Sequence, residues 1–239
     1  MRRKNHEINM CGRYTLRRYE LARAVFEALR AIGFEEFSEL RIHWWNIAPS
    51  QQVPVVQMDQ NGERVITRAQ WGFIPEWAKE PPKVRPINAR AETVSTSGMF
   101  RRAFHSRRCL IPADGYYEWQ GAKPPKQPYF IHLKNDELFA FAGLWERWLP
   151  HKDATPIDTC TILTTQPNEL MSPIHNRMPV IVARQDYRRW LDSAARGEEV
   201  ADILKPYSAE EMDAYAITSA VNSPKNDGPE LIRPASESR

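Results

Sequence analysis

Short runs of β-favouring residues, each bounded by turn residues, recur along most of this chain and limit the folds open to it. Residues 53–58 and 64–71 flank Gln60-Asn61-Gly62, and an Asn-Gly pair between two such runs predicts a hairpin turn. Residues 115–119 and 128–133 flank a polar loop of Gly, Lys and Pro, which predicts a second hairpin. The 19 prolines are spread through the loops. This pattern predicts an antiparallel sheet with many stiff connections.

Two further strands and four helices are expected. The run 139–145 is apolar on both faces and predicts a central strand, and 159–165 predicts the strand that follows. We expect helices at 19–32, 99–105, 168–171 and 185–191. No repeat or linker divides the 239 residues, so we expect one α+β domain with an antiparallel, barrel-like sheet flanked by short helices.

Composition narrows the cellular setting. No apolar stretch approaches the roughly 20 residues that span a bilayer, and no apolar segment follows the charged first nine residues, so we expect a cytoplasmic protein. Three cysteines make no disulfide framework, and we expect Cys109 and Cys160 to be packed thiols. No cysteine and histidine spacing fits zinc, so we expect no metal and no cofactor.

The formal charge is +3, and it falls to about +1 without the first ten residues, which hold three cations and one anion. Binding of a polyanion therefore requires a local patch, because the net field is small. The sequence gives no sign of an oligomer, and we expect a monomer.

Cys11 directly follows a second methionine, Met10. A chain that began at Cys11 would carry an α-amine and a thiol on adjacent carbons. The α-amine has a pKa near 7.7–8.0, so roughly a quarter of it is neutral near pH 7.4. A neutral amine attacks an aldehyde to form an imine, and the thiol can close onto that imine as a thiazolidine. The alternative is that Met10 is internal and Cys11 is a small buried residue.

Three further stretches place polar groups in stiff settings. Asn88, Arg90 and Glu92 alternate at period two, which suits one face of a strand that carries chemistry or a solvated edge strand. Glu118 stands among aromatic residues, where desolvation raises a carboxyl pKa and suits it to proton transfer; a surface glutamate is the alternative. His175 lies in a loop bracketed by prolines and is catalytic, structural or solvated.

A fifth stretch suggests a ligand. Trp71, Phe73 and Trp77 surround a Gly and a Pro, with cationic residues close in sequence. Aromatic rings interleaved with cations suit single-stranded nucleic acid, because bases stack on rings and phosphates bind cations. Tryptophans of a core are the alternative. Met99, followed by Phe100 and two arginines, reads as an apolar wedge or as a helix start.

Together these stretches resemble the SRAP family, the SOS-response-associated peptidases that are also called abasic site processing proteins. The resemblance runs from Cys11 almost to Ile232 and rests on six short motifs in the family's order. The motifs are Met10-Cys11-Gly12-Arg13-Tyr14, Trp45-Asn46-Ile47-Ala48-Pro49, Trp71-Gly72-Phe73-Ile74-Pro75, Asn88-Ala89-Arg90-Ala91-Glu92-Thr93, Asp114-Gly115-Tyr116-Tyr117-Glu118-Trp119 and Ile174-His175-Asn176-Arg177-Met178-Pro179. The resemblance implies a positively charged groove and covalent capture of abasic sites in single-stranded DNA.

The resemblance also implies roles for single residues. The catalytic set would be Cys11, Asn88, Glu118 and His175. Phosphates would be held by Arg13, Arg90 and Arg177, bases by Trp71, Trp77 and Met99, and the loop beneath them by Asn46. Weak lyase activity at abasic sites, self-cleavage before Cys11 and association with the nucleoid follow as expectations. Rival functions are a cysteine peptidase that acts on other proteins and a non-covalent module for single-stranded DNA.

One departure from the family concerns the start of the chain. The family's cysteine follows the initiator methionine, whereas nine residues precede Met10 here. A Cys11 nitrogen held in an amide bond forms no imine, so translation starts at Met10 or the extension removes itself. We therefore expect an extension at 1–10, the SRAP domain at 11–233 and a disordered tail at 234–239.

Overall fold

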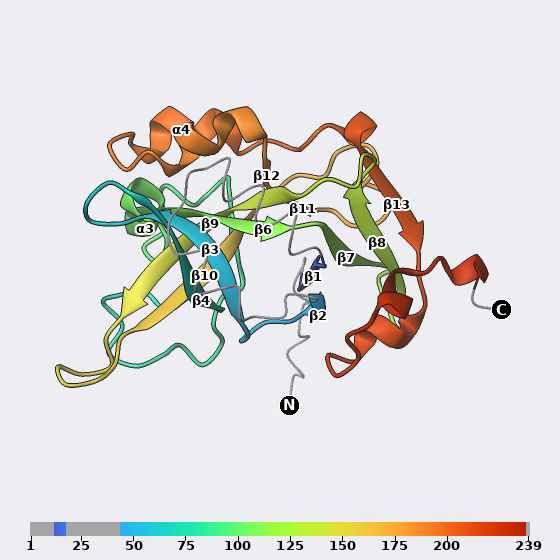
Figure 1. The fold of residues 1–239 in the computed structure, drawn as a ribbon, viewed down its shortest axis with the longest axis horizontal. Coiled ribbons are helices and arrows are strands. Elements are labelled where there is room, and N and C mark those ends of the chain that lie inside the picture. Colours follow the sequence, from blue (N-terminus) through green and yellow to red (C-terminus); the bar gives the residue numbers. More distant parts are fainter. Residues whose placement is uncertain (1–11, 18–43, 238–239) are drawn as a thin grey trace.

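Two β-sheets that share one core form the centre of the computed structural model, which describes residues 12–17 and 44–237 (Figure 1). The helices are short and lie outside the sheets. The expected α+β class with a barrel-like sheet is confirmed.

Five strands of the larger sheet close into a barrel, because each of them pairs with two others around a ring. In ring order they are β10 (Ile157–Thr165), β4 (Arg64–Trp71), β3 (Gln52–Met58), β6 (Arg108–Ala113) and β9 (Phe139–Trp148), which pairs again with β10. All neighbours are antiparallel except β4 and β10, which are parallel. Three short strands extend the sheet: β5 (Asn88–Arg90), β11 (Met178–Pro179) and β12 (Ile181–Val182).

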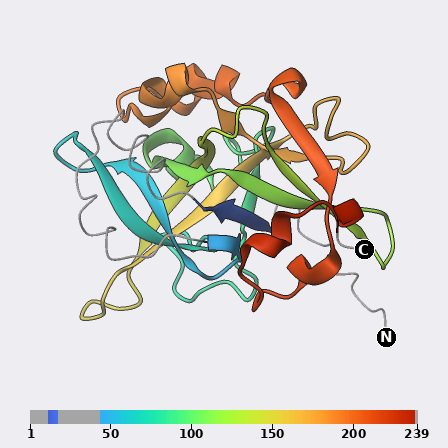
Figure 2. The ribbon, with the colours of Figure 1, turned by 45° about the vertical axis from the view of Figure 1, so that its right-hand side comes forward.

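The second sheet is antiparallel throughout and has the order β13–β8–β7–β1–β2. Its strands are β13 (Met212–Ala216), β8 (Gln127–Leu133), β7 (Gly115–Gln120), β1 (Arg13–Leu16) and β2 (Trp44–Ile47). The chain passes from the barrel strand β6 into β7 through Asp114 alone. The four-residue strand β1 is therefore a central strand, with β7 on one side and β2 on the other (Figure 2).

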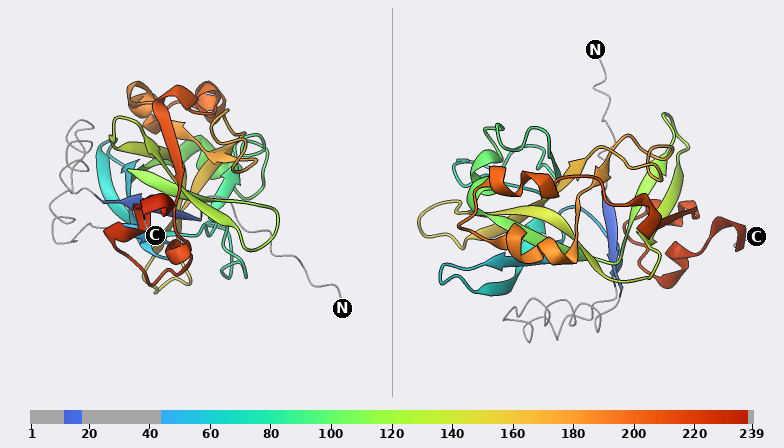
Figure 3. Two further views of the ribbon diagram at one scale, coloured as in Figure 1. Left: turned by 90° about the vertical axis from the view of Figure 1, so that its right-hand side faces the viewer. Right: turned by 90° about the horizontal axis from the view of Figure 1, so that it is seen from above.

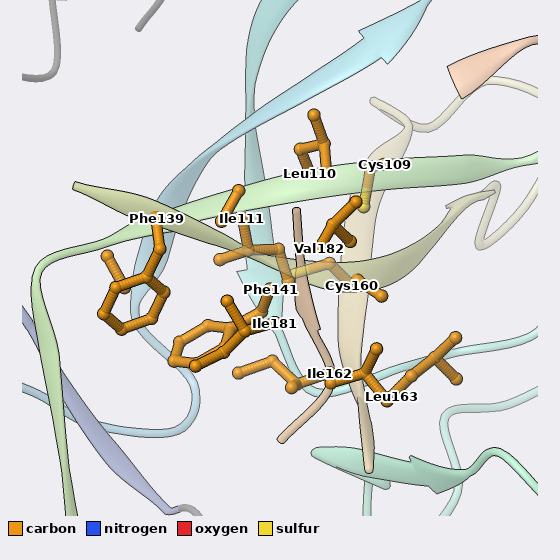
Figure 4. Packing of buried hydrophobic residues seen from close by; sticks show 14 of the residues in the cluster. Cys109, Leu110, Ile111, Phe139, Phe141, Cys160, Ile162, Leu163, Ile181 and Val182 are labelled. Carbon is orange, nitrogen blue, oxygen red and sulfur yellow. The ribbon is translucent and has the colours of Figure 1, made fainter. Parts of the chain in front are cut away.

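Apolar side chains of the barrel strands fill its interior (Figure 4). Cys109, Phe141, Cys160 and Ile162 are all fully buried there. Burial raises the pKa of both thiols well above the usual range, so neither forms a thiolate near neutral pH. The prediction that Cys109 and Cys160 are packed thiols is confirmed.

Two α-helices and six 3-10 turns complete the described chain. They are α3 (Arg101–Ser106), α4 (Tyr187–Leu191), η1 (Arg184–Asp186), η2 (Gly197–Ile203), η3 (Ala209–Glu211), η4 (Ser219–Asn222), η5 (Pro229–Ile232) and η6 (Ala235–Glu237). Helix α4 lies over the barrel, and the C-terminal turns lie beside the second sheet (Figures 1 and 3). Within these described residues, no helix has the length and apolar character needed to cross a membrane.

Both predicted hairpins and the predicted helices near α3 and α4 are confirmed. The helix predicted at 168–171 is wrong: residue 168 is irregular and residues 169–171 form a turn. The Asn168 side chain accepts the Met171 N–H at 2.9 Å, and Pro173 brings no N–H with which a helix could continue. The helix predicted at 19–32 lies outside the described residues. Beyond residue 233, Pro234 bridges to Ile217 and η6 follows, and the expected boundary and disordered tail stay a prediction.

Candidate active site

The loop that carries His175 is held by hydrogen bonds along its length. Asn168 Oδ1 accepts the Met171 N–H, and the His175 N–H donates to Met171 O at 2.9 Å. The Arg177 N–H donates to His175 Nδ1 at 3.2 Å, so the neutral ring carries its proton on Nε2. Burial of the half-buried ring, aided by the charges of Lys126 and Arg177, lowers the pKa of His175.

Arg177 joins this loop to the barrel. Its Nη1 and Nη2 donate to the two carboxylate oxygens of Glu92 at 2.5 and 2.8 Å, and Nη2 also donates to Thr164 O at 2.7 Å. The hydrogen bonds from Arg177 lower the pKa of Glu92. The guanidinium is thus engaged within the protein. Its expected contact with a DNA phosphate stays a prediction, and that contact would have to share the group with Glu92.

Strand β5 places Asn88 and Arg90 on one face. It runs parallel to β10, with Asn88 opposite Ile162 and Arg90 opposite Thr164. The intervening Ala89 is buried, whereas Asn88 is half-buried and Arg90 is exposed. Within the described residues, no hydrogen bond or ion pair engages the Arg90 guanidinium, which makes it the cation of this site most available to a phosphate.

Glu118 is buried on β7 and not a surface glutamate. It is only 2 % exposed, and its Oε1 accepts the Trp119 N–H at 3.1 Å. Gln120 shares this face of β7, since side chains alternate along a strand. The Gln120 Nε2 donates to Pro173 O at 2.9 Å. The loop that carries His175 therefore docks on the face of β7 that carries Glu118.

Arg13 and Asn46 bind the C-terminal part of the chain. Arg13 donates to Asn46 Oδ1 and to Val221 O, both at 2.9 Å, and its partial burial lowers the pKa of its guanidinium. Asn46 is 3 % exposed and donates to Ser223 O and Asn226 O at 3.0 and 2.8 Å. Asn46 thus holds the loop at 221–226 in place, and Arg13 reaches the same loop.

The three residues expected at the bases differ in exposure. Trp71 is 1 % exposed, its ring packs edge-on against Tyr14, and its indole N–H donates to Ile87 O at 2.9 Å. The core thus encloses most of the ring, and the expected contact of Trp71 with a DNA base stays a prediction. Trp77 is 62 % exposed, and Met99 packs against the core while half-buried.

Cys11 lies outside the described residues, but the point at which the chain enters the described fold is defined. Gly12 directly precedes β1, and Arg13 at the start of β1 pairs with Tyr117, the neighbour of Glu118. The residue after Cys11 therefore stands one position away from the strand pair that carries Glu118.

Sequence reasoning left two residues of this arrangement without a role. Glu92 anchors Arg177, and Gln120 anchors the loop of His175. The alternation of Asn88, Arg90 and Glu92 was a usable signal for Glu92, whereas nothing near Gln120 in the sequence indicates its partner. No group of three or more His, Cys, Asp or Glu in residues 12–17 and 44–237 could hold a metal ion.

Fold and site together define an α+β protein with a closed five-stranded barrel, in which the loop of His175 docks on β7, the strand that carries Glu118 and pairs with β1. The family model of SOS response associated peptidases (SRAP) matches residues 10–224. The abasic site processing proteins YoqW and YoaM of Bacillus subtilis are 43 % and 42 % identical to this chain over 226 residues. Each alignment covers 93 % of this chain, with 99 % of YoqW and 97 % of YoaM.

A crystal structure of a protein from Bacteroides thetaiotaomicron superposes with a TM-score of 0.83 at 26 % identity, covering 94 % of this chain and 100 % of that one. The chain belongs to the SRAP family.

Proposed function

We propose that this chain processes abasic sites in single-stranded DNA by linking covalently to them through Cys11. The names of its relatives support the substrate class. One observation carries the proposal: Gly12 leads into β1, which pairs with β7. Strand β7 holds Glu118 and contacts the loop of His175. An N-terminal nucleophile on Cys11 would start beside both proton-transfer groups.

The chemistry begins with the abasic sugar, whose ring form must open to an aldehyde. A protonated His175 donates a proton to the ring oxygen as it leaves C1′, and the C1′ hydroxyl gives up its proton to water as the aldehyde forms, so ring opening consumes no net proton. The neutral α-amine of Cys11 then adds to C1′, and the carbinolamine loses water to give an imine. Glu118 accepts the proton from the amine and returns one to the leaving hydroxyl, so no net proton is consumed in this step.

The thiol of Cys11 closes the adduct. Its sulfur adds to the imine carbon and its proton passes to the imine nitrogen, which gives a thiazolidine. Asn88 holds the product by hydrogen bonds. The imine stage also acidifies the 2′ position, so weak lyase activity by β-elimination accompanies the main reaction. Arg90, Arg13 and Arg177 hold phosphates, with the exposed Arg90 as the first contact.

The first ten residues must be absent for this chemistry. We propose that translation begins at Met10 or that Cys11, Glu118 and His175 cleave the extension as an intramolecular thiol peptidase. Intact-mass measurement of the purified protein shows whether the chain begins at Cys11 or retains residues 1–10. Active protein that retains residues 1–10 would refute the imine step.

A denaturing gel tests the covalent step. A chain that begins at Cys11 is mixed with an oligonucleotide that bears one abasic site, and we expect a band that survives denaturation. Two controls should abolish the band: Cys11→Ala, and an oligonucleotide whose abasic aldehyde has been reduced to the alcohol. Equal binding of intact DNA with no such band would favour a non-covalent module. Cleavage of an unrelated protein, with no band, would favour a peptidase.

A further inference from the structure

Arg177 contacts His175 and Glu92 with different parts of the same residue. Its main-chain N–H donates to His175 Nδ1, and its guanidinium forms a two-pronged ion pair with Glu92. The guanidinium also donates to Thr164 O on β10. The Arg177 side chain therefore connects the residue that bonds the imidazole to barrel strand β10, in addition to the main-chain pairing of Met178 with Thr165.

The ion pair lies in a partly desolvated setting. The side chain of Arg177 is 14 % exposed and that of Glu92 is 40 % exposed. The Arg177 Nε is buried and makes no hydrogen bond within the described residues. Within the described residues, the Glu92 carboxylate is the only anion paired with the Arg177 guanidinium. Loss of this carboxylate would leave a largely buried positive charge without its counterion.

We propose that Glu92 is a positioning residue that fixes the orientation and tautomer of His175 through Arg177. The inference rests on the proposed function, because it concerns the residue to which ring opening is assigned. The carboxylate holds the guanidinium, the guanidinium holds the main chain at Arg177, and the main-chain N–H holds Nδ1 as an acceptor. Proton transfer depends steeply on such alignment, since small displacements of a reacting group cost large factors in rate.

The same geometry separates a positioning role from a role in DNA affinity. Glu92 is negative and lies beside cations expected to meet phosphates, so its removal should leave the affinity for intact DNA equal or higher. Removal of a residue that contacts the DNA directly would instead lower the affinity for intact DNA. On removal of the Glu92 carboxylate, we therefore expect the rate of adduct formation at saturating DNA to fall. The affinity for intact DNA should rise or stay the same.

The test compares Glu92→Gln with Asp202→Asn. Asp202 forms a similar two-pronged pair with Arg189 at 2.5 and 2.7 Å, on an exposed surface of the molecule. We expect Glu92→Gln to slow adduct formation at saturating abasic DNA by about tenfold and Asp202→Asn to leave it unchanged. In an Arg177→Ala background, Glu92→Gln should have no further effect, because the link is already broken.

A spectroscopic arm reads the imidazole directly. In protein with 15N-labelled histidine, His175 should show one tautomer with the proton on Nε2, and Glu92→Gln should show exchange between tautomers. An unchanged rate, an unchanged His175 spectrum, or a rate loss matched by weaker DNA binding would each overturn the proposal. If the unaltered protein forms no adduct at all, the proposed function fails, whereas the spectrum still decides whether Glu92 positions His175.

Discussion

Asp114 holds the short strand β1 in place, and its replacement gives a stringent test of this architecture. Its buried carboxylate accepts the Thr15 hydroxyl at 2.5 Å, the Arg17 N–H at 2.7 Å and the Arg17 Nε–H at 3.0 Å. The Asp114 N–H donates to Thr15 O at 3.0 Å. One carboxylate therefore fastens the C-terminal end of the strand whose N-terminal end leads to Cys11.

Removing that carboxylate leaves the buried Arg17 without its nearest anion, and breaking a buried pair in this way costs about 3–5 kcal/mol. The lower value applies here, because Asp136 stays at 3.6 Å and the ring of Phe130 at 5.3 Å from the Arg17 guanidinium. We expect Asp114→Ala to lower the free energy of unfolding by about 3 kcal/mol. For a domain of this size the Tm falls by roughly 6–12 °C.

Urea unfolding followed by tryptophan fluorescence measures this change. Asp114→Asn keeps one acceptor oxygen and should cost about 2 kcal/mol, and the exposed Asp213→Asn should stay within about 0.5 kcal/mol. The adduct rate of a chain that begins at Cys11 should fall in the same order. A loss below about 1 kcal/mol for Asp114→Ala would show that β1 does not depend on this carboxylate.

Three further predictions concern packing, DNA contact and pH. Gly115→Ala should cost about 1–3 kcal/mol in urea unfolding, because a Cβ there would lie 2.3 Å from Phe130 Cζ; a neutral result would show that the Phe130 ring moves aside. Trp77→Ala should weaken binding of intact single strands by about 1–3 kcal/mol in fluorescence anisotropy while stability is unchanged, and equal affinity would exclude stacking. If a protonated His175 and a neutral Cys11 amine are both required, the adduct rate should be level between their pKa values. Since burial lowers the His175 pKa, the adduct rate of the unaltered protein should begin to fall only below the ordinary histidine pKa of 6.5. In a His175→Gln variant the amine alone sets the limit, so the adduct rate should already fall below about pH 8.

Local signals in the sequence predict the hairpin at 53–71 because the residues that favour the turn lie within the turn itself. Gly62 has φ +78°, a conformation that glycine adopts without strain, and Asp59 accepts the Asn61 N–H at 2.9 Å. Barrel closure has no such signal. The parallel pairing of β10 with β4 and β5 joins residues such as Cys160 and Trp71, which are distant in sequence, and their register follows from packing in the folded chain.

The sequence motifs predict which residues belong to the candidate site. They do not predict which partners those residues contact. The sequence identifies Trp71 and Trp77 alike as aromatic, but one ends a barrel strand beside Tyr14 and the other lies in an exposed loop. Likewise, Arg90 and Arg177 are both cations in short motifs. Only the fold shows that Glu92 neutralises one of them and leaves the other open to solvent.

The central place of β1 has a mechanical consequence. A pull on residue 11 enters the fold through Gly12 along the strand axis, and the ladders to β7 and β2 would carry it together in shear. Strands loaded in this direction must break several hydrogen bonds at once, whereas a peeled edge strand loses them one by one. If Cys11 links to DNA as we propose, a motor enzyme that pulls on that DNA would load both ladders of β1.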